Sequence, residues 1–413
     1  MSREPETAPA QVLVADDVEM NRDLLARRVR RLGHEVTMAE DGVRALELLK
    51  ARDFDVLLLD IMMPNMNGYE VLEAMALDER LRRVPVIMIS AVDDKESIAR
   101  CIGLGADDYL PKPFDPVILQ ARLGASLARK RLHDREQLYQ KSLERELEIG
   151  REIQAHFLPD SLPILPGFDF AARLRSARMV SGDFYDLYPL GGGTEVVAVV
   201  GDVCDKGVGA ALFMALFRSL LRALTEQSDG ARWNERGASR ERRRDAGTRT
   251  EAVTGHLLRT VTLANDYIAG THSRSNMFAT VFFAIIDADS GLVQYVNAGH
   301  EPPAVVGPAG VRRLEPTGPA LGLLPGLPFV VSRTTLAPGE TLVAWTDGVT
   351  EAQATGTTEL FGEERTLAVA EGTDGTAAEL LDRMLAVVDA YAAGAEQADD
   401  ITLLAVRRLG AEG

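Results

Sequence analysis

Unbroken apolar runs alternate with helical patterns in the first part of the chain. The apolar runs cover residues 11–15, 35–39, 55–59, 86–89 and 109–110. Helical patterns at 21–32 and 42–51 separate the first three runs, and Gly33 is a typical helix stop. Strands that are apolar throughout are buried on both faces, which is typical of parallel sheets. The pattern therefore predicts a doubly wound α/β unit with a five-stranded parallel sheet and helices on both faces.

A long helical pattern follows this unit. Asp115 and Pro116 are typical of a helix start, and the pattern continues to about residue 157, before Pro159. Apolar residues recur in it at seven-residue spacing: Leu132, Tyr139 and Ile153, then Leu143 and Phe157, with interruptions at Glu146 and Gly150. This spacing predicts a parallel coiled coil that joins two copies of the chain into a homodimer. The alternative is a single charged connecting helix that packs on its neighbours.

From residue 166 onward, short apolar runs mostly have the period of two that is typical of strands. The runs cover residues 168–172, 196–200, 279–286, 293–297, 304–306, 342–345 and 401–406. Three helical patterns interrupt them, at residues 210–224, 253–269 and 377–392. Strands in groups with few helices predict a layered α+β fold built on antiparallel sheets.

These patterns divide the chain into three parts. We expect an N-terminal domain at 10–128, a helical or coiled-coil linker at 129–160 and a C-terminal domain at 161–410. The C-terminal domain contains a polar, arginine-rich stretch at 228–251 that has few apolar residues. Such a stretch cannot bury a core, so we interpret it as a mobile insertion. A partner-docking or nucleic-acid-binding role is the alternative.

Composition narrows the class of protein: among 413 residues, 45 Lys and Arg against 62 Asp and Glu give a net charge of −17. An acidic chain does not suit nucleic-acid binding, which normally uses a basic face. The two cysteines, Cys101 and Cys204, allow no disulfide framework or zinc-ligand spacing. The longest apolar run, 277–286, falls short of the roughly 20 residues that span a bilayer, and residues 1–10 lack a signal-peptide core. We therefore expect a cytoplasmic protein with no membrane or nucleic-acid partner.

Polar side chains stand at the ends of the predicted parallel strands. Asp16 and Asp17 follow the first strand, Asp60 the third, Ser90 the fourth and Lys112 the fifth. Ligands of such sheets bind beyond the carboxyl ends of the strands. Carboxylates and a lysine there suit Mg²⁺ and a phosphoryl group, because Mg²⁺ prefers a few carboxylates together with phosphate oxygens. The alternative is that each acidic residue only caps the helix that follows it.

The motifs around these residues resemble the receiver domain of two-component response regulators. They are D-D at 16–17, D-I-M-M-P-N-M-N-G at 60–68, S-A at 90–91 and K-P-F at 112–114. The resemblance implies a flavodoxin-like fold and phosphorylation of Asp60 by a sensor histidine kinase or a phosphotransfer protein. It also implies that Asp16, Asp17 and Asp60 hold Mg²⁺. Roles in phosphoryl binding and switching are implied for Ser90, Tyr109 and Lys112.

Acidic residues also stand at the ends of apolar runs in the C-terminal part. They are Asp202 in Gly201-Asp202, Asp347 in Thr346-Asp347-Gly348, Asp399 and Asp400 before the last run, and Asp183 in S-G-D-F-Y-D at 181–186. Carboxylates without a cluster of Cys or His select Mg²⁺ or Mn²⁺ over zinc. Two such ions can share a carboxylate, lower the pKa of a water and bind phosphoryl oxygens. His300 in N-A-G-H-E-P-P is either a local acid or a turn residue.

The C-terminal part resembles the SpoIIE/RsbU branch of the PPM-type, metal-dependent serine/threonine protein phosphatases. The motifs that carry this resemblance are E-L-E-I-G-R-E-I-Q-A-H-F-L-P at 146–159, S-G-D-F-Y-D at 181–186, G-D-V-C-D-K-G-V-G-A-A-L-F-M-A at 201–215, M-F-A-T at 277–280, N-A-G-H at 297–300, T-D-G-V-T-E-A at 346–352 and D-D-I-T at 399–402. The resemblance implies a layered antiparallel β-sandwich flanked by helices, with two Mn²⁺ or Mg²⁺ ions. The implied ligands are Asp202, the Val203 carbonyl, Asp347 and Asp399, with Asp183 at the edge of the site and Asp400 as the alternative to Asp399. We interpret Asp205, in the same motif as Asp202, as a turn residue.

The two resemblances together predict a response regulator with an enzymatic output, in which phosphorylation of Asp60 controls a protein phosphatase. In the resembling branch the substrate is typically a phosphorylated STAS-type anti-sigma-factor antagonist, which implies a partner-switching pathway. The alternative is a non-catalytic, receiver-controlled adaptor whose second domain only binds a partner. A DNA-binding response regulator does not fit, because the chain is acidic and lacks a basic recognition-helix pattern.

Overall fold

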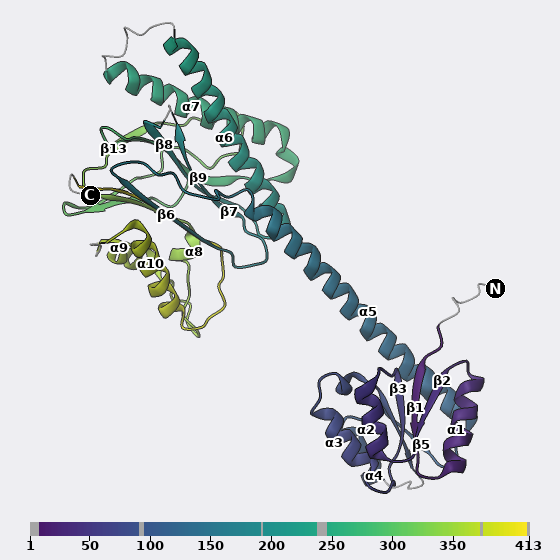
Figure 1. Ribbon diagram of the computed structural model, residues 1–413. Helices are drawn as coiled ribbons and strands as arrows, with labels where there is room; N and C mark the ends of the chain where they lie inside the picture. Colours follow the sequence, from purple (N-terminus) through teal and green to yellow (C-terminus); the bar gives the residue numbers. More distant parts are fainter. Residues whose placement is uncertain (1–7, 91–94, 191–192, 238–245, 372–374, 411–413) are drawn as a thin grey trace. The chain divides into compact units, whose positions relative to one another are not determined.

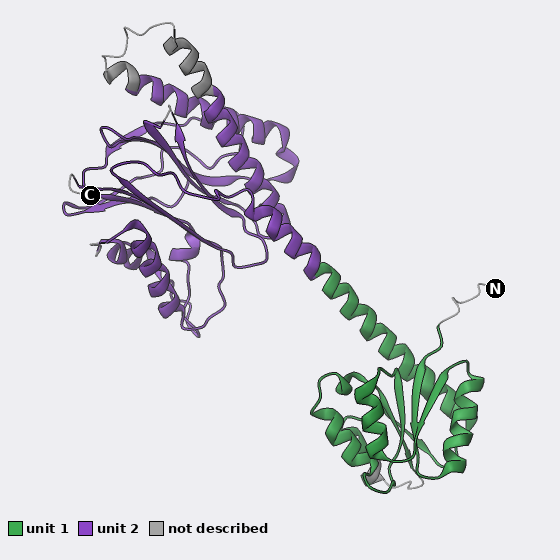
Figure 2. Cartoon of the chain, viewed as in Figure 1, with its two compact units in different colours: residues 1–143 green, residues 144–413 purple. Residues whose placement is uncertain are grey.

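The computed structural model describes residues 8–90, 95–190, 193–237, 246–371 and 375–410 (Figure 1). The chain forms two compact units, residues 1–143 and 144–413 (Figure 2). Helix α5, Pro116–Ala155, contributes residues to both units. The division falls inside the stretch 129–160, which remains our proposed linker.

The first unit contains one parallel sheet with the strand order β2-β1-β3-β4-β5. Its strands are β1 Gln11–Ala15, β2 Glu35–Ala39, β3 Val56–Asp60, β4 Val86–Ser90 and β5 Asp108–Pro111. Besides the start of α5, its helices are α1 Glu19–Arg31, α2 Gly42–Ala51, α3 Gly68–Ala76, the 3-10 helix η1 Leu81–Arg83 and α4 Lys95–Gly103. Successive residues of a strand face opposite sides, so Leu13 joins one core while Val12 and Val14 join the other. Two cores on one sheet confirm the doubly wound α/β fold.

The second unit contains two antiparallel sheets with the orders β13-β10-β9-β8-β7 and β12-β11-β14-β15-β6. The strands of the first sheet are β7 Asp183–Leu190, β8 Glu195–Val203, β9 Ala279–Asp287, β10 Leu292–Ala298 and β13 Ser332–Thr335. Those of the second are β6 Phe168–Arg175, β11 Ala304–Gly307, β12 Gly310–Arg313, β14 Thr341–Trp345 and β15 Ile401–Arg408. Side chains from both sheets, such as Val200, Phe282, Leu342 and Leu404, form a common core.

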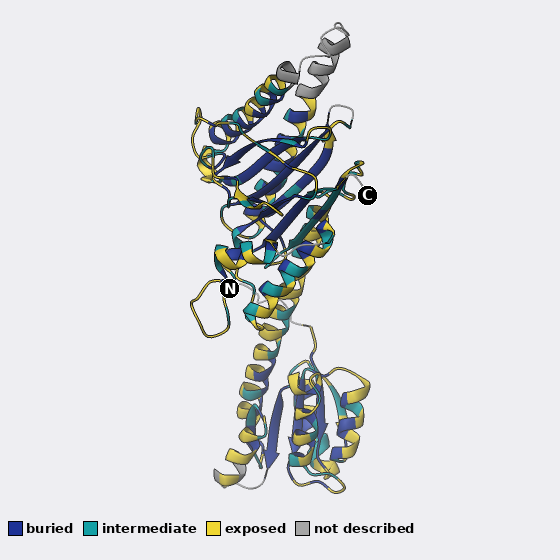
Figure 3. Ribbon diagram, turned by 90° about the vertical axis from the view of Figure 1, so that its left-hand side faces the viewer, coloured by how far each residue is buried: buried dark blue, intermediate teal, exposed yellow. Residues whose placement is uncertain are grey.

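Helices cover the outer faces of this sandwich. They are α6 Val208–Gly237, α7 Ala246–Thr271, the 3-10 helix η3 Ser273–Ser275, α8 Asp347–Thr350, α9 Gly362–Glu371 and α10 Ala377–Ala392. Helices α6 and α7 pack with the first sheet, and α9 and α10 with the second. The central strands are therefore buried almost throughout, whereas the edge strands β12 and β13 and much of α5 are exposed or half-buried (Figure 3). The four layers confirm the predicted α+β sandwich and position the loops at its edge.

Several elements of the second unit were not predicted, among them the short strands β12 and β13 and the helices α8 and α9, and two further regions differ from the sequence expectation. The motif at 181–186 opens strand β7, which we did not predict because two of its buried residues, Asp183 and Asp186, are charged and interrupt the apolar run. Helix α6 continues to Gly237 and α7 begins at Ala246, so the described parts of 228–251 have helical backbone. Polar residues such as Glu and Arg favour helices, and this stretch contains no proline. Residues 238–245, which also belong to the expected mobile insertion, lie outside the described residues.

Helix α6 is the one helix in the described part of the chain that is long and apolar enough to cross a membrane, over Val208–Gln227. One face of it packs in the core of the first sheet, through Ala210, Met214, Phe217 and Leu221. In the same stretch, Arg218 and Arg222 form ion pairs with Asp186 of β7. Packing within the second unit therefore accounts for its apolar character.

An ion pair between an exposed arginine and a buried glutamate joins the edge strand β12 to the residue before β14. Arg312 donates from both terminal nitrogens to Glu340, at 2.6 and 2.8 Å, and the Ala337 N–H donates to the same carboxylate at 2.8 Å. The Arg312 hydrogen bonds lower the pKa of Glu340 below its ordinary value of 4.5. Because its folded-state pKa is lowered, Glu340 stabilises the fold above pH 4.5, and this contribution is lost as the pH falls through the lowered pKa.

We expect Glu340→Gln to reduce the free energy of unfolding at pH 7 by about 1 kcal/mol, because the buried carboxylate loses charge-assisted hydrogen bonds, although solvent screens the exposed Arg312. The difference in the free energy of unfolding between this variant and the wild type should become smaller as the pH falls from 7 to 3. Urea denaturation at each pH measures this difference. Glu315→Gln is the matched control, because Glu315 pairs with Arg313 at 3.6 Å in an exposed position and should change stability by less than about 0.5 kcal/mol. A pH-independent effect of Glu340→Gln would contradict the role of its charge.

Candidate functional site

The carboxyl ends of the parallel strands in the first unit bring three acidic residues and a lysine together. Asp16 follows β1, Asp60 ends β3 and Lys112 follows β5. The Lys112 Nζ lies 2.8 Å from Asp16 Oδ2 and 2.8 Å from Asp60 Oδ2. One carboxylate oxygen each of Asp16, Asp17 and Asp60 lies within 4.8 Å of the other two. The strand-end residues that the sequence singles out thus converge on one crevice.

Electrostatics at this crevice favour a cation. Burial raises the pKa of Asp60, the Lys112 ammonium opposes this shift, and the charges of Asp16 and Asp17 add to it. Asp17 is exposed, whereas Asp16 and Asp60 are buried. Oxygen ligands with one open side are the donor set that Mg²⁺ takes in phosphoryl-transfer sites. The residues present therefore fit the implied ion.

The two remaining receiver residues lie on the neighbouring strands. Ser90 ends β4 and is buried, and its carbonyl oxygen accepts a hydrogen bond from the Lys112 N–H at 2.8 Å. Tyr109 in β5 is also buried, with its hydroxyl 3.5 Å from the Ser90 carbonyl oxygen. The ring is thus packed beside the crevice and is not an exposed strand-end aromatic. Its switching role stays a prediction.

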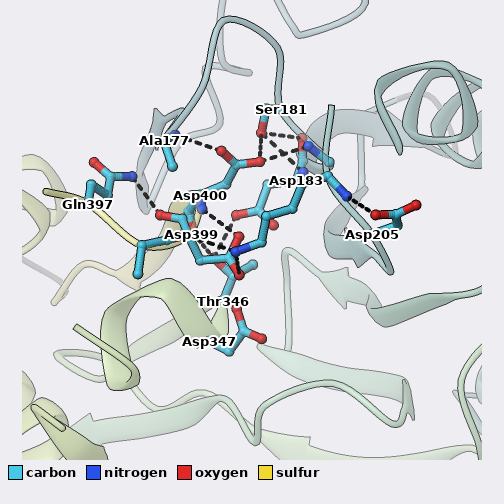
Figure 4. A network of polar contacts seen from close by, with 12 residues as sticks. Ala177, Ser181, Asp183, Asp205, Thr346, Asp347, Gln397, Asp399 and Asp400 are labelled. Carbon is cyan, nitrogen blue, oxygen red and sulfur yellow. Dashed lines mark hydrogen bonds and ion pairs between the residues drawn. The ribbon is translucent and has the colours of Figure 1, made fainter. Parts of the chain in front are cut away.

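In the second unit, acidic residues from both sheets gather at one end of the sandwich (Figure 4). Asp183 begins β7 and is directly opposite Asp202, the penultimate residue of β8. Asp347 begins α8, immediately after β14, and Asp399 precedes β15. One oxygen each of Asp347, Asp399 and Glu351 lies within 4.8 Å of the others. Figure 4 shows the segments that carry Asp183, Asp347 and Asp399.

Glu351 is the member of this group that our sequence analysis missed. It stands four residues after Asp347, in T-D-G-V-T-E-A, and a separation of four places two side chains on the same face of a helix. The short helix α8 provides that geometry. The signal was present in a motif we had quoted, and exposed glutamates at helix ends are too common to be singled out without the structure.

Mutual repulsion of the carboxylates is strong. Burial, followed by the charge of Asp347, raises the pKa of Asp202 to about 7. Burial, followed by the charge of Asp399, raises the pKa of Asp347 to about 6. Burial and the charge of Asp202 raise the pKa of the fully buried Asp183. A divalent cation would relieve this repulsion, and a donor set of carboxylates alone fits Mg²⁺ or Mn²⁺.

The two neighbouring acids, Asp399 and Asp400, have different surroundings. Asp400 is buried, and its carboxylate accepts hydrogen bonds from the Ala177 N–H at 2.7 Å, the Gly182 N–H at 2.8 Å and the Ser181 hydroxyl at 2.9 Å. Asp399 instead belongs to the acidic group. These contacts support Asp399 as the metal ligand and give Asp400 the role of holding the loop that contains Ser181.

Two close contacts fix this arrangement. The Thr346 hydroxyl donates to Asp183 Oδ2 at 2.7 Å and accepts from the Thr402 N–H at 2.9 Å, so it joins β7 to the second sheet. Gly348 follows Asp347, and a Cβ on it would overlap the Asp400 carbonyl oxygen. Only glycine lets α8 approach the segment before β15 so closely.

Three further residues lie around the group. Lys206 Nζ lies 2.8 Å from Asp399 Oδ2, so in the described chain an ammonium compensates part of its charge. Asp205 is exposed and has a φ of 75°, which supports its interpretation as a turn residue. His300 is buried, its backbone N–H donates to Asn297 Oδ1 at 2.8 Å, and burial lowers the pKa of its imidazole to about 4. A histidine that is neutral at pH 7 and bound to its own turn favours the structural alternative for His300.

Comparison with known families agrees with this geometry. The family described as Stage II sporulation protein E (SpoIIE) matches residues 192–409, slightly more than half of the chain. The response regulator receiver domain family matches residues 12–124. The two matches correspond to the parallel sheet and to most of the sandwich.

Individual relatives cover one part of the chain each. Protein IcfG of a Synechocystis species is 42% identical over 264 residues, which are 64% of this chain and 41% of IcfG. Response regulator PleD of Caulobacter vibrioides is 41% identical over 124 residues, which are 30% of this chain and 27% of PleD. The chain therefore spans less than half the length of either relative.

A solved structure supports the fold of the second unit. The SiaA-PP2C domain of Pseudomonas aeruginosa has a TM-score of 0.51 and 20% sequence identity, and the match covers 65% of this chain and 98% of that domain. The likeness shows the PP2C-type fold alone. Together with the family matches, it completes the assignment: the chain belongs to the SpoIIE family, with a response regulator receiver domain before its PP2C-type domain.

Proposed function

We propose that this chain is a phosphorylation-controlled, metal-dependent protein serine/threonine phosphatase. The observation that carries the proposal is the convergence of carboxylates from both sheets, Asp202 from the first and Asp347 and Asp399 from the second. Burial, together with the neighbouring carboxylates, raises the pKa of Asp202 and of Asp347, which supports a site that takes up positive charge. The family membership supports the same activity, and the chain is proposed to act in the cytoplasm.

In this proposal some acidic residues bind the metal ions and others hold those ligands in place. Asp202, Asp347 and Asp399, with the Val203 carbonyl, are the proposed ligands of two Mn²⁺ or Mg²⁺ ions. Such a pair of ions supplies an activated water nucleophile and positive charge at the phosphoryl oxygens. Asp183 holds Asp202 in place from the opposite strand, and Asp400 holds the loop beside Asp399.

We expect the chain to hydrolyse p-nitrophenyl phosphate only when Mn²⁺ or Mg²⁺ is present. Asp202→Asn and Asp347→Asn should each reduce kcat by at least about 100-fold, because each removes a charge that holds the ions. Asp205→Asn is the matched control, since Asp205 is exposed in the same turn and should keep near wild-type activity. Hydrolysis that persists in both site variants would contradict the proposed centre, and no hydrolysis by the wild type would favour the alternative of a non-catalytic adaptor.

The receiver unit is the proposed controller. A sensor histidine kinase or a phosphotransfer protein would supply the phosphoryl group to Asp60, with Mg²⁺ at Asp16, Asp17 and Asp60 and with Ser90 and Lys112 binding the phosphoryl oxygens. Tyr109 would report this change through its rotamer. Helix α5 is the proposed route to the phosphatase unit, because its residues belong to both units.

The substrate that we propose is a serine- or threonine-phosphorylated STAS-type anti-sigma-factor antagonist. We expect BeF₃⁻, which mimics the phosphoryl group on Asp60, to change kcat/KM for this substrate by about fivefold or more, the usual size of a coupling between two sites. Asp60→Asn should abolish the response to BeF₃⁻ but leave the Mn²⁺-dependent activity. An unchanged rate on adding BeF₃⁻ would contradict receiver control, and wild-type turnover of p-nitrophenyl phosphate without turnover of the antagonist would contradict the substrate class alone.

A parallel coiled coil through α5 is the proposed basis of a homodimer. Leu132, Tyr139 and Ile153 are exposed on this helix at the predicted seven-residue spacing, with Leu143 also exposed. Burial against a second copy would remove these apolar side chains from water.

We expect analytical ultracentrifugation to show a dimer at micromolar concentrations. Replacing both Leu132 and Tyr139 by Lys should weaken dimerisation by at least about tenfold, because two apolar contacts are replaced by charges. Gln140→Lys adds one charge at an exposed polar position on the same helix and should leave the dimer intact. A wild-type chain that is monomeric at every concentration tested would leave the single connecting helix as the correct interpretation.

A further inference from the structure

The end of helix α5 contacts the phosphatase unit through one side-chain amide. Gln154 Nε2 donates to the Ser181 carbonyl oxygen at 2.6 Å, and the Ser181 N–H donates to Gln154 Oε1 at 2.9 Å. Two hydrogen bonds between one amide and one backbone residue fix both the distance and the orientation of the pair. Ser181 is buried and Gln154 is half-buried, so water competes poorly for these bonds.

The preceding turn of α5 lies beside the same segment of the second unit. Gly150 lies four residues before Gln154 and therefore on the same face of the helix. A Cβ on Gly150 would lie 3.8 Å from Val180 Cγ1, and Val180 is buried beside Ser181. The glycine that interrupts the seven-residue pattern therefore faces the Val180 side chain.

Ser181 leads directly to the acidic group. Its hydroxyl donates to Asp400 Oδ2 at 2.9 Å and accepts from the Asp183 N–H at 3.1 Å. The adjacent Gly182 N–H donates to the same Asp400 oxygen at 2.8 Å. Asp400 in turn donates its N–H to Asp399 Oδ1 at 2.8 Å. Figure 4 shows the part of this network from Ser181 to Asp399.

We propose that Gln154 is a positioning residue for the metal centre: through Ser181 and Asp400 it lets helix α5 determine how the Asp399 carboxylate is presented. This inference rests on the proposed function, because it takes Asp399 as a metal ligand. Every other step is a hydrogen bond between residues of the second unit. Groups that orient a metal ligand are worth about 10–100-fold in metal affinity in proteins.

The resulting prediction concerns Mn²⁺ affinity, measured by titration calorimetry on the full chain. Gln154→Ala should weaken Mn²⁺ binding by about tenfold, lower p-nitrophenyl phosphate turnover at limiting Mn²⁺ and regain most of it at saturating Mn²⁺, with KM unchanged. Gln154→Glu keeps the acceptor for the Ser181 N–H but loses the donor, so its affinity should fall between those of the wild type and Gln154→Ala. Glu152→Ala, in the same turn and exposed, is the matched control and should bind Mn²⁺ like the wild type.

The outcomes separate this inference from the proposed function. The positioning role would be overturned if Gln154→Ala bound Mn²⁺ with an affinity within twofold of that of the wild type. It would also be overturned if the wild type bound no Mn²⁺. A lower melting temperature with unchanged affinity would show that Gln154 only anchors the helix, which also overturns it. If Gln154→Ala does not fold, an unchanged affinity in Gln154→Glu overturns the inference. If the wild type binds Mn²⁺ without hydrolysing p-nitrophenyl phosphate, the phosphatase proposal fails, while a tenfold weaker affinity in Gln154→Ala would still support the positioning role.

Discussion

Repulsion between carboxylates held close together in partly dry surroundings is the constraint on which both candidate sites depend. In the first unit the constraint is met from inside, because Lys112 bonds to Asp16 and Asp60 at 2.8 Å. In the second unit, among the described residues, Lys206 reaches only Asp399, and Asp183 is held by the Thr346 hydroxyl. The first site thus contains its own positive charge and the second contains little, which agrees with our proposal of one cation at the first site and two at the second.

The packing of the sandwich holds these carboxylates close together in spite of their repulsion. The acidic residues of the second site lie at or just beyond the ends of β7, β8, β14 and β15. The apolar side chains of these strands pack both between the two sheets and against the outer helices, so the strands cannot separate to relieve the repulsion. The Thr346 hydroxyl joins the two sheets at this edge, and the close backbone contact at Gly348 holds α8 against the segment before β15. The packing energy of the fold therefore offsets the electrostatic cost of the site, as is common where function and stability compete.

Most of the fold and the strand-end acids were predictable, because apolar periodicity marks strands and the residue after a strand end lies at an edge of the sheet. Strand β7 was not predictable in this way, since Asp183 and Asp186 are buried with partners that only the fold supplies. The choice between Asp399 and Asp400 also needed the structure, because adjacent residues differ only in what surrounds them. Glu351 escaped notice because α8 is one turn long, too short for a periodic signal. We did not predict the continuation of α6, because we took the polarity of this stretch as evidence against regular structure. Polarity excludes a buried core but does not exclude a helix.

The position of β8 within its sheet has a consequence for how the second site can change. Asp202 is paired on both sides, with Asp183 of β7 and with Thr280 of β9, so its backbone cannot shift without breaking two ladders of hydrogen bonds. Ser181 and Asp399 precede β7 and β15 and carry no such double constraint. The site thus has a fixed part at Asp202 and an adjustable part at Ser181 and Asp399. A signal that reaches the site can move only the adjustable part.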